Sequence, residues 1–242
     1  VIMARISPDG EQVAYVRAAD FFPASLWVVQ RDGSGARELM SAADLNAAAA
    51  VDGALGNIPY QVEWVPGRAN LLAVGTRPVF EGPGLMLNED LILIDTLTAA
   101  RTNLLAPGMG GMFVFSPDGA QIALVKTEQI DLVNTDGSNR RSGVLTFPFV
   151  LTYSEYAYYA EPVWAADGSF LRVAIPPAKS LDEPDQPARL WQIPTDGSAA
   201  VQIGSVLTAP LTSPVFSPDL NRLAYLTDPT PGSGLLDLYI SA

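Results

Sequence analysis

The chain has 242 residues, 48% of them hydrophobic and 17% charged, which is a composition typical of a folded globular protein. It contains no histidine and no cysteine, which excludes Ser-His-Asp and Cys-His relays, disulfides, and metal sites built on those side chains. Its net charge of −12 opposes binding to nucleic acids and anionic membrane surfaces. No uncharged apolar run approaches the roughly 18 residues of a membrane span, so none is expected.

One local pattern recurs along the chain: an apolar strand enters a tight turn and leaves as a second apolar strand. The turn reads Ser-Pro-Asp-Gly at residues 7–10 and 116–119, is shortened at 217–219, and is degenerate at 66–67 and 167–168. These turns lie about 50 residues apart, a spacing that indicates an internal repeat. Serine and aspartate side chains satisfy turn backbone groups and proline fixes φ, so the repetition favours a structural role for the motif over a catalytic one.

A second hairpin follows within each repeat. Apolar strands lead into Asp-Gly turns at residues 32–33, 136–137 and 196–197, and into an Asp-Thr turn at 95–96. Asp-Gly between two apolar runs is a strong hairpin signal because glycine supplies the positive φ. Four short strands in a unit of roughly 40 to 50 residues are typical of a propeller blade.

We therefore predict an all-β fold, a β-propeller of four-stranded antiparallel blades with five countable repeats, the last one incomplete. The expected domain spans residues 1–242, with approximate blades at 1–40, 61–105, 112–145, 161–203 and 213–242. The tryptophans also follow the repeat. Trp64 matches Trp164 and Trp27 matches Trp191, which favours packing over ligand binding for all four.

The Ser-Pro-Asp-Gly element, followed by an Ile-Ala or Leu-Ala strand and an Asp-Gly-Ser hairpin, resembles the TolB-type (PD40, WD40-like) propeller repeat over nearly the whole chain. This resemblance implies a protein- or peptide-binding scaffold in the cell envelope, periplasmic or at the cell surface, among exported proteins and lipoproteins. The same family includes the propellers that precede hydrolase domains in prolyl-oligopeptidase-like enzymes. TolB itself has six blades, so five repeats are a departure: either the last blade has three strands, or the chain is a piece of something longer.

Long connections are expected on one face of the propeller. Connections between second and third strands, and between blades, emerge together and vary in length, with the longest at residues 41–60, 77–89, 146–161 and 176–188. Long loops on a rigid scaffold are where function concentrates, so we expect a ligand on that face.

The connection at residues 147–161 is the best candidate because it gathers aromatic side chains and two glutamates. Tyrosine offers a rigid apolar ring and a hydroxyl, which suits recognition of a protein or sugar. The alternative is that the rings pack between blades. The candidate ligand-binding residues are Tyr153, Glu155, Tyr156, Tyr158, Tyr159 and Glu161, together with Tyr60 and Glu63 of the second repeat.

Two further segments differ from the repeat. Residues 44–51 are rich in alanine and favour a helix, although a linker is an equal alternative. The acidic residues 182–185 carry oxygen ligands but no calcium-loop spacing, so we expect them to be solvated. No metal and no cofactor are expected.

Three functions remain open. The first is a non-catalytic scaffold for a protein or peptide, and we expect no enzymatic activity from this chain. The second is the accessory, substrate-gating propeller of a prolyl-oligopeptidase-like hydrolase. The third is a glycan-active propeller that uses paired carboxylates, for which Glu63 and Glu161 offer thin support.

Overall fold

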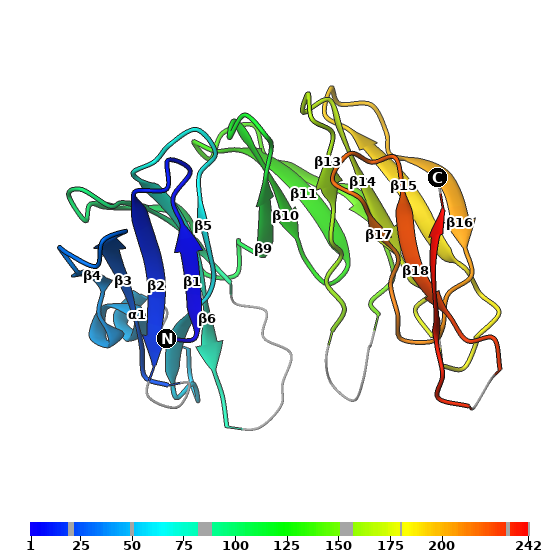
Figure 1. Ribbon diagram of the computed structural model, residues 1–242, viewed down its shortest axis with the longest axis horizontal. Coiled ribbons are helices and arrows are strands. Elements are labelled where there is room, and N and C mark those ends of the chain that lie inside the picture. Colours follow the sequence, from blue (N-terminus) through cyan, green and yellow to red (C-terminus); the bar gives the residue numbers. More distant parts are fainter. Residues whose placement is uncertain are drawn as a thin grey trace. The chain divides into compact units, whose positions relative to one another are not determined.

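The computed structural model describes residues 1–18, 22–48, 51–81, 89–150, 157–179, 181–230 and 233–241 (Figure 1). The described residues are nearly all β, with one helix and five antiparallel sheets of four, four, four, four and three strands. This confirms the predicted fold class, an all-β propeller architecture with an incomplete last repeat. The chain divides into two compact units, Val1–Gly119 with Thr135–Ser138, and Ala120–Asn134 with Asn139–Ala242.

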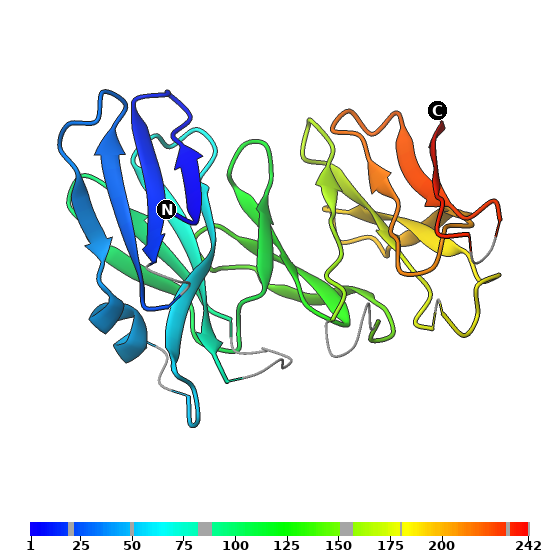
Figure 2. The same ribbon diagram turned by 60° about the horizontal axis from the view of Figure 1, so that its bottom comes forward.

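The first unit contains two complete sheets, visible in blue and cyan in Figure 2. The first sheet has the order β1 (Met3–Ile6), β2 (Gln12–Ala18), β3 (Ala24–Gln30) and β4 (Arg37–Met40). The second has the order β5 (Gly56–Trp64), β6 (Leu71–Val79), β7 (Leu91–Asp95) and β8 (Arg101–Leu105). The helix α1 (Ala42–Ala48) connects them, and β9 (Met112–Phe115) follows.

The second unit contains the remaining strands. β10 (Gln121–Val125), β11 (Gln129–Asn134) and β12 (Arg141–Thr146) belong to the third sheet, whose order is β12-β11-β10-β9. The fourth sheet has the order β13 (Val163–Trp164), β14 (Phe170–Ile175), β15 (Ala188–Pro194) and β16 (Val201–Val206). The fifth has the order β17 (Val215–Phe216), β18 (Leu223–Thr227) and β19 (Asp237–Ser241).

The repeated Ser-Pro-Asp-Gly turn closes the hairpin of the first two strands through its own side chains. The Ser7 hydroxyl donates to Asp9 Oδ1 at 2.6 Å and accepts the Gln12 N–H at 2.9 Å. The same serine–aspartate bond recurs between Ser116 and Asp118, at 2.6 Å. These side chains therefore complete the turns, as the sequence predicts, and the hydroxyl hydrogen bond lowers the pKa of Asp9.

Each unit has its own apolar core, built from the inward positions of its strands. In the first unit, Leu26, Val62, Leu72 and Ile94 are buried, and Trp64 closes the cluster while its indole N–H donates to the Arg5 carbonyl at 3.1 Å. Alternation along the strand explains this, because every second side chain faces inward. In the second unit, a cluster at the fourth and fifth sheets contains Ala165, Phe216, Leu220 and Leu223.

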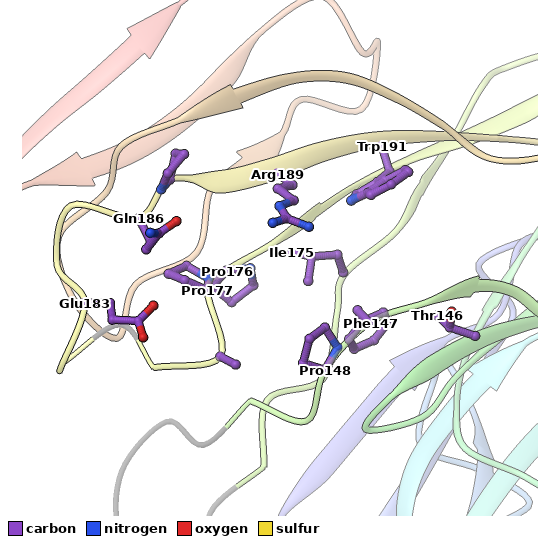
Figure 3. A pocket seen from close by; sticks show the side chains of 12 residues that line it. Thr146, Phe147, Pro148, Ile175, Pro176, Pro177, Glu183, Gln186, Arg189 and Trp191 are labelled. Atoms are coloured by element: carbon purple, nitrogen blue, oxygen red, sulfur yellow. The ribbon is translucent and has the colours of Figure 1, made fainter.

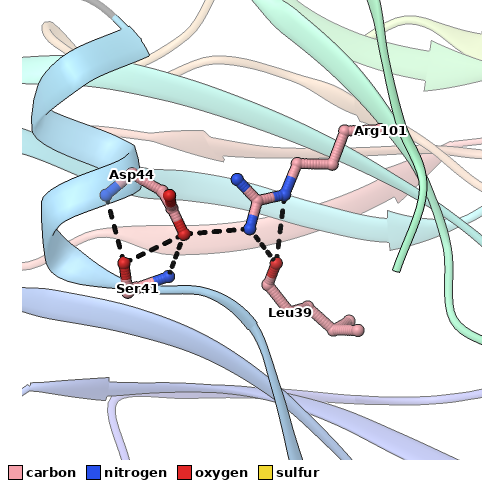
Figure 4. Close-up of polar contacts among 4 residues, drawn as sticks. All are labelled: Leu39, Ser41, Asp44 and Arg101. Carbon is pink, nitrogen blue, oxygen red and sulfur yellow. Dashed lines mark hydrogen bonds and ion pairs between the residues drawn. The ribbon is translucent and has the colours of Figure 1, made fainter. Parts of the chain in front are cut away.

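The alanine-rich segment does form a helix, and its first turn is capped. The Ser41 hydroxyl accepts the Asp44 N–H at 3.1 Å, and Asp44 Oδ2 accepts the Ser41 N–H at 3.0 Å, a reciprocal capping box (Figure 4). Arg101 joins this cap to the second sheet by donating to Asp44 Oδ2 at 2.9 Å and to the Leu39 carbonyl.

The second sheet begins earlier than the sequence suggests. Residues 41–60 and 77–89 read as connections, but β5 starts at Gly56 and β6 continues to Val79, with Asn57 paired to Pro78 and Ile58 to Arg77. The expectation of irregular chain at 56–60 and 77–79 is therefore wrong. Pro59 is tolerated because β5 is the edge strand of its sheet and the register shifts between Pro59 and Gln61.

The last sheet differs from the others in the burial of its third strand. The third strands β3, β7, β11 and β15 each bury at least two side chains, whereas all five residues of β19 are exposed. β19 is also an edge of its sheet.

Candidate functional site

A cavity of about 230 Å³ lies within the second unit, beside the connection that follows β12 and the connection between β14 and β15. Both connections are among the long ones singled out from the sequence. We call it the Trp191 cavity (Figure 3). Its lining residues are Thr146, Phe147, Pro148, Ile175, Pro176, Pro177, Ala178, Glu183, Gln186, Pro187, Arg189 and Trp191.

The walls of the Trp191 cavity are unusually rich in proline. Pro148 comes from the connection after β12, and Pro176, Pro177 and Pro187 come from the connection between β14 and β15. Proline has a fixed φ and no N–H, so these walls are stiff and offer no backbone donor at four positions. Extended, proline-containing peptides pack in grooves lined by aromatic side chains, and Phe147 and Trp191 supply such side chains here.

Short backbone hydrogen bonds hold both connections in place. The Phe147 N–H donates to the Glu128 carbonyl at 2.9 Å, which fixes the chain as it leaves β12. The Lys179 carbonyl accepts the N–H of Glu183 at 2.8 Å, and the Glu183 carbonyl accepts the N–H of Gln186 at 3.1 Å. Two local turns therefore position Glu183 and Gln186 at the rim.

Strand β15 supplies the floor. Arg189 and Trp191 are two residues apart on this strand and both line the cavity, whereas Leu190 between them does not. This follows from the period of two along a strand, which places alternate side chains on the same face. Arg189 is exposed and the Trp191 ring is half-buried, so both remain accessible to a ligand.

The predicted aromatic connection contributes an anchor next to this region. The Tyr158 hydroxyl donates to the Ala174 carbonyl at 3.0 Å and lies 3.0 Å from Ser213 Oγ, and the Tyr158 N–H donates to the Val150 carbonyl at 2.9 Å. Burial raises the pKa of Tyr158 to about 12. The Tyr158 hydroxyl therefore has hydrogen-bond partners within the protein, and a role of Tyr158 in binding stays a prediction.

Of the other candidates in this connection, the structure describes Tyr159 and Glu161. Tyr159 is half-buried and Glu161 is exposed. Tyr153, Glu155 and Tyr156 lie outside the described residues. Their role in binding stays a prediction.

Tyr60 and Glu63 lie on β5 in the first unit. The Arg77 guanidinium stacks on the Tyr60 ring at 5.4 Å, and Arg5 Nε donates to Glu63 Oε1 at 3.1 Å. Glu63 is therefore already paired with a cation. Its role in binding also stays a prediction.

Acidic side chains do not gather into a metal site in the described part of the chain. Asp182, Glu183 and Asp185 are exposed, and no group of three or more acidic residues among the described ones is placed to hold a metal ion. Asp131 is fully buried instead, held by Arg140 at 2.7 Å.

Among the described residues, no helix has the length and apolarity needed to cross a bilayer.

Sequence reasoning missed Arg189 and assigned Trp191 to packing alone. The signal was present in the repeat: Trp27 follows Ser25, whereas Trp191 follows Arg189 at the same spacing. A long cationic side chain in place of a small polar one marks the position as different.

Comparisons with known proteins support the fold. No protein-family model matches the chain, and no curated protein matches it. A crystal structure of TolB from Acinetobacter baumannii is similar, with a TM-score of 0.53 and 15% identity over 96% of this chain and 50% of that one. This chain has a TolB-like propeller fold.

Two peptidase structures are similar to the TolB-like chain as well. A prolyl endopeptidase matches with a TM-score of 0.58 and 14% identity, over 98% of this chain and 33% of that one. The acylaminoacyl peptidase of Pyrococcus horikoshii matches with a TM-score of 0.55 and 14% identity, over 99% and 37%. The chain thus spans half the length of the TolB structure and about a third of each peptidase. At these identities the similarity shows the fold alone.

Proposed function

We propose that this TolB-like chain is a non-catalytic scaffold that binds a peptide segment of a protein partner in the Trp191 cavity. The observation that carries the proposal is the cavity itself: four prolines and a tryptophan form an accessible apolar surface, with Arg189 and Glu183 available for polar contacts. A cavity of about 230 Å³ is smaller than the roughly 300–1,000 Å³ typical of sites for drug-sized ligands. It suits two or three residues of a longer peptide.

The proposed partner is extracytoplasmic, in keeping with the TolB-like fold.

We further propose that the five sheets form one propeller domain over residues 1–242. Small-angle X-ray scattering of the purified chain tests this, because two independently moving units would give a broader distance distribution than a single domain.

Binding to an array of proline-containing octapeptides tests the proposed function. Trp191→Ala should weaken peptide binding at least about tenfold, because an aromatic side chain that becomes buried under the ligand dominates such contacts. Val201→Ala is the matched control, since Val201 is an exposed apolar residue of β16 that does not line the cavity. Equal binding by Trp191→Ala and the wild type would remove the proposal.

A second candidate is the accessory propeller of a hydrolase, and its support is the similarity to the two peptidases over nearly all of this chain. The coding sequence downstream of residue 242 discriminates between the two. A hydrolase domain encoded in the same reading frame would favour the accessory role, and a stop codon would exclude it.

A further inference from the structure

Two tryptophans at equivalent positions in the repeat have different surroundings. Trp27 lies on the third strand of the first sheet, and its indole N–H donates to Ser25 Oγ at 2.9 Å. Tyr15 stacks against its ring with centroids 6.5 Å apart, and the Arg17 guanidinium lies 5.2 Å from the ring centroid. Its donor and its ring are thus both engaged within the protein.

Trp191 occupies the same position on the third strand of the fourth sheet, but its donor is not used. Within the described ranges, its indole N–H makes no hydrogen bond. Arg189 stands where the first sheet has Ser25, and its guanidinium makes no hydrogen bond or ion pair with any residue that the structure describes. Figure 3 shows both side chains among those that line the cavity, with the indole nitrogen on the side toward the guanidinium.

Among the described residues, the exposed Arg68 and Arg222 likewise show no side-chain hydrogen bond or ion pair, and of these three arginines only Arg189 lines the Trp191 cavity. Arg140 and Arg101, for comparison, are each paired with an aspartate, at 2.7 and 2.9 Å. A guanidinium and an indole N–H are hydrogen-bond donors only, so a ligand that binds both of them must carry hydrogen-bond acceptors. The acceptor that best matches a guanidinium is a carboxylate, which takes two of its N–H groups at once.

We infer that the Trp191 cavity recognises a carboxylate of its peptide ligand through the Arg189 guanidinium and the Trp191 indole N–H. This inference rests on the proposed function and names the ligand's chemistry. Apolar ligand side chains pack on Pro148, Pro176 and Pro177. Glu183, on the rim of the same cavity, works against the bound anion and sets the affinity below what Arg189 alone would give.

The carboxylate has two possible sources, the C-terminus of the peptide or an acidic side chain. Three probes distinguish them: acetyl-Ala-Pro-Pro-Leu with a free C-terminus, its C-terminal amide, and the amide with aspartate in place of the second proline. A second set of the same three probes has phenylalanine in place of the C-terminal leucine. Binding is measured by chemical-shift perturbation at millimolar peptide.

We expect the wild type to bind at least one carboxylate-bearing probe about tenfold more tightly than the plain amide, as a charge-assisted bidentate contact predicts. Arg189→Gln should abolish that preference, and Trp191→Phe, which keeps the ring but removes the donor, should reduce it about threefold. Glu183→Gln should strengthen binding of the carboxylate probe. Arg222→Gln is the control, because it removes an exposed cation of the same unit outside the cavity.

The outcomes separate the two proposals. If only the probe with the free C-terminus binds more tightly than the plain amide, the site recognises the peptide's C-terminal carboxylate. If the aspartate amide also binds more tightly than the plain amide, the site accepts an acidic side chain. If both carboxylate-bearing probes bind no more tightly than the plain amide, or if Arg189→Gln weakens carboxylate-bearing and plain probes alike, the carboxylate inference is overturned and peptide binding stands. No binding of any probe to the wild type would remove both.

Discussion

Asp131 and Arg140 form a buried ion pair within the second unit. The Arg140 guanidinium donates to Asp131 Oδ2 at 2.7 Å, and Asp131 has no exposed surface. The other oxygen accepts the Gly143 N–H at 2.8 Å, where the register between β11 and β12 shifts. The carboxylate thus fills a gap in the ladder of backbone hydrogen bonds. Burial raises the pKa of Asp131, but the hydrogen bonds from Arg140 and Gly143 outweigh it and hold the pKa below its ordinary value.

Removing one partner of this pair should be costly. Arg140→Ala leaves Asp131 buried without its closest cation, and we expect the free energy of unfolding to fall by about 3 kcal/mol. Urea denaturation of the variant measures this. Arg222→Ala, which removes an exposed arginine, should change stability by less than about 0.5 kcal/mol. A loss below about 1 kcal/mol for Arg140→Ala would show that the remaining donors suffice.

Two glycines in equivalent turns should respond differently to alanine. Gly10 and Gly119 have φ angles of +75° and +70°, so alanine is strained at both, at about 1 kcal/mol. A Cβ at Gly10 meets nothing within 4 Å, whereas one at Gly119 would lie 2.6 Å from the Pro66 carbonyl oxygen. We expect Gly119→Ala to cost about 3 kcal/mol or more, because backbone must move. Equal melting temperatures for Gly10→Ala and Gly119→Ala would refute the close approach.

Tyr158 should make stability sensitive to alkaline pH. Tyr158→Phe should lower the free energy of unfolding by about 1 kcal/mol at pH 7, because the Ala174 carbonyl loses its donor. The pKa of Tyr158 is raised from 10.0 to about 12, so its contribution is complete below pH 10 and is lost as the pH rises toward 12. The advantage of the wild type over Tyr158→Phe should therefore shrink across that window. Denaturation midpoints at pH 8, 10 and 12 measure it, and a constant difference would contradict the prediction.

Asp44 should act at the opposite end of the pH scale. Hydrogen bonds from Arg101 and from Ser41 lower its pKa from 3.8 to about 2. Its contribution is present above pH 3.8 and is lost as the pH falls toward 2. Asp44→Asn should lower the melting temperature by roughly 2 °C at pH 7, since the pair is partly exposed, and the difference should vanish near pH 2. A difference that persists at pH 2 would assign the effect to packing.

The sequence predicts the local parts of this fold well, and the reason is visible at Ser7 and Asp9. Their side chains form hydrogen bonds within the turn in which they lie, so the residue types at these positions are enough to predict the hydrogen bonds. The extension of β5 was not predictable in this way. Gly56 and Pro59 read as loop residues, and only the pairing of Asn57 with Pro78 and of Ile58 with Arg77 turns the segment into strand.

In the candidate site as well, some features could be predicted from the sequence and others could not. The long connections at 146–161 and 176–188 could be selected from their length, and both contribute to the Trp191 cavity. Beyond the change from serine to arginine within the repeat, nothing in the sequence shows that the Arg189 guanidinium makes no hydrogen bond or ion pair with any described residue, because that depends on its surroundings in space. The sequence also could not show that the Tyr158 hydroxyl donates to the Ala174 carbonyl and lies near Ser213 Oγ, and a role of Tyr158 in binding stays a prediction.

The exposed outer strand β19 has a consequence for handling the protein. Leu238 and Ile240 are 66% and 63% exposed, and no further strand of the described part of the chain pairs with the outer edge of β19. An open edge of this kind recruits any extended segment that meets it, including the same edge of another molecule. Concentrated samples should therefore form oligomers of several sizes by pairing of β-strand edges, and Leu238→Lys should keep the protein monodisperse.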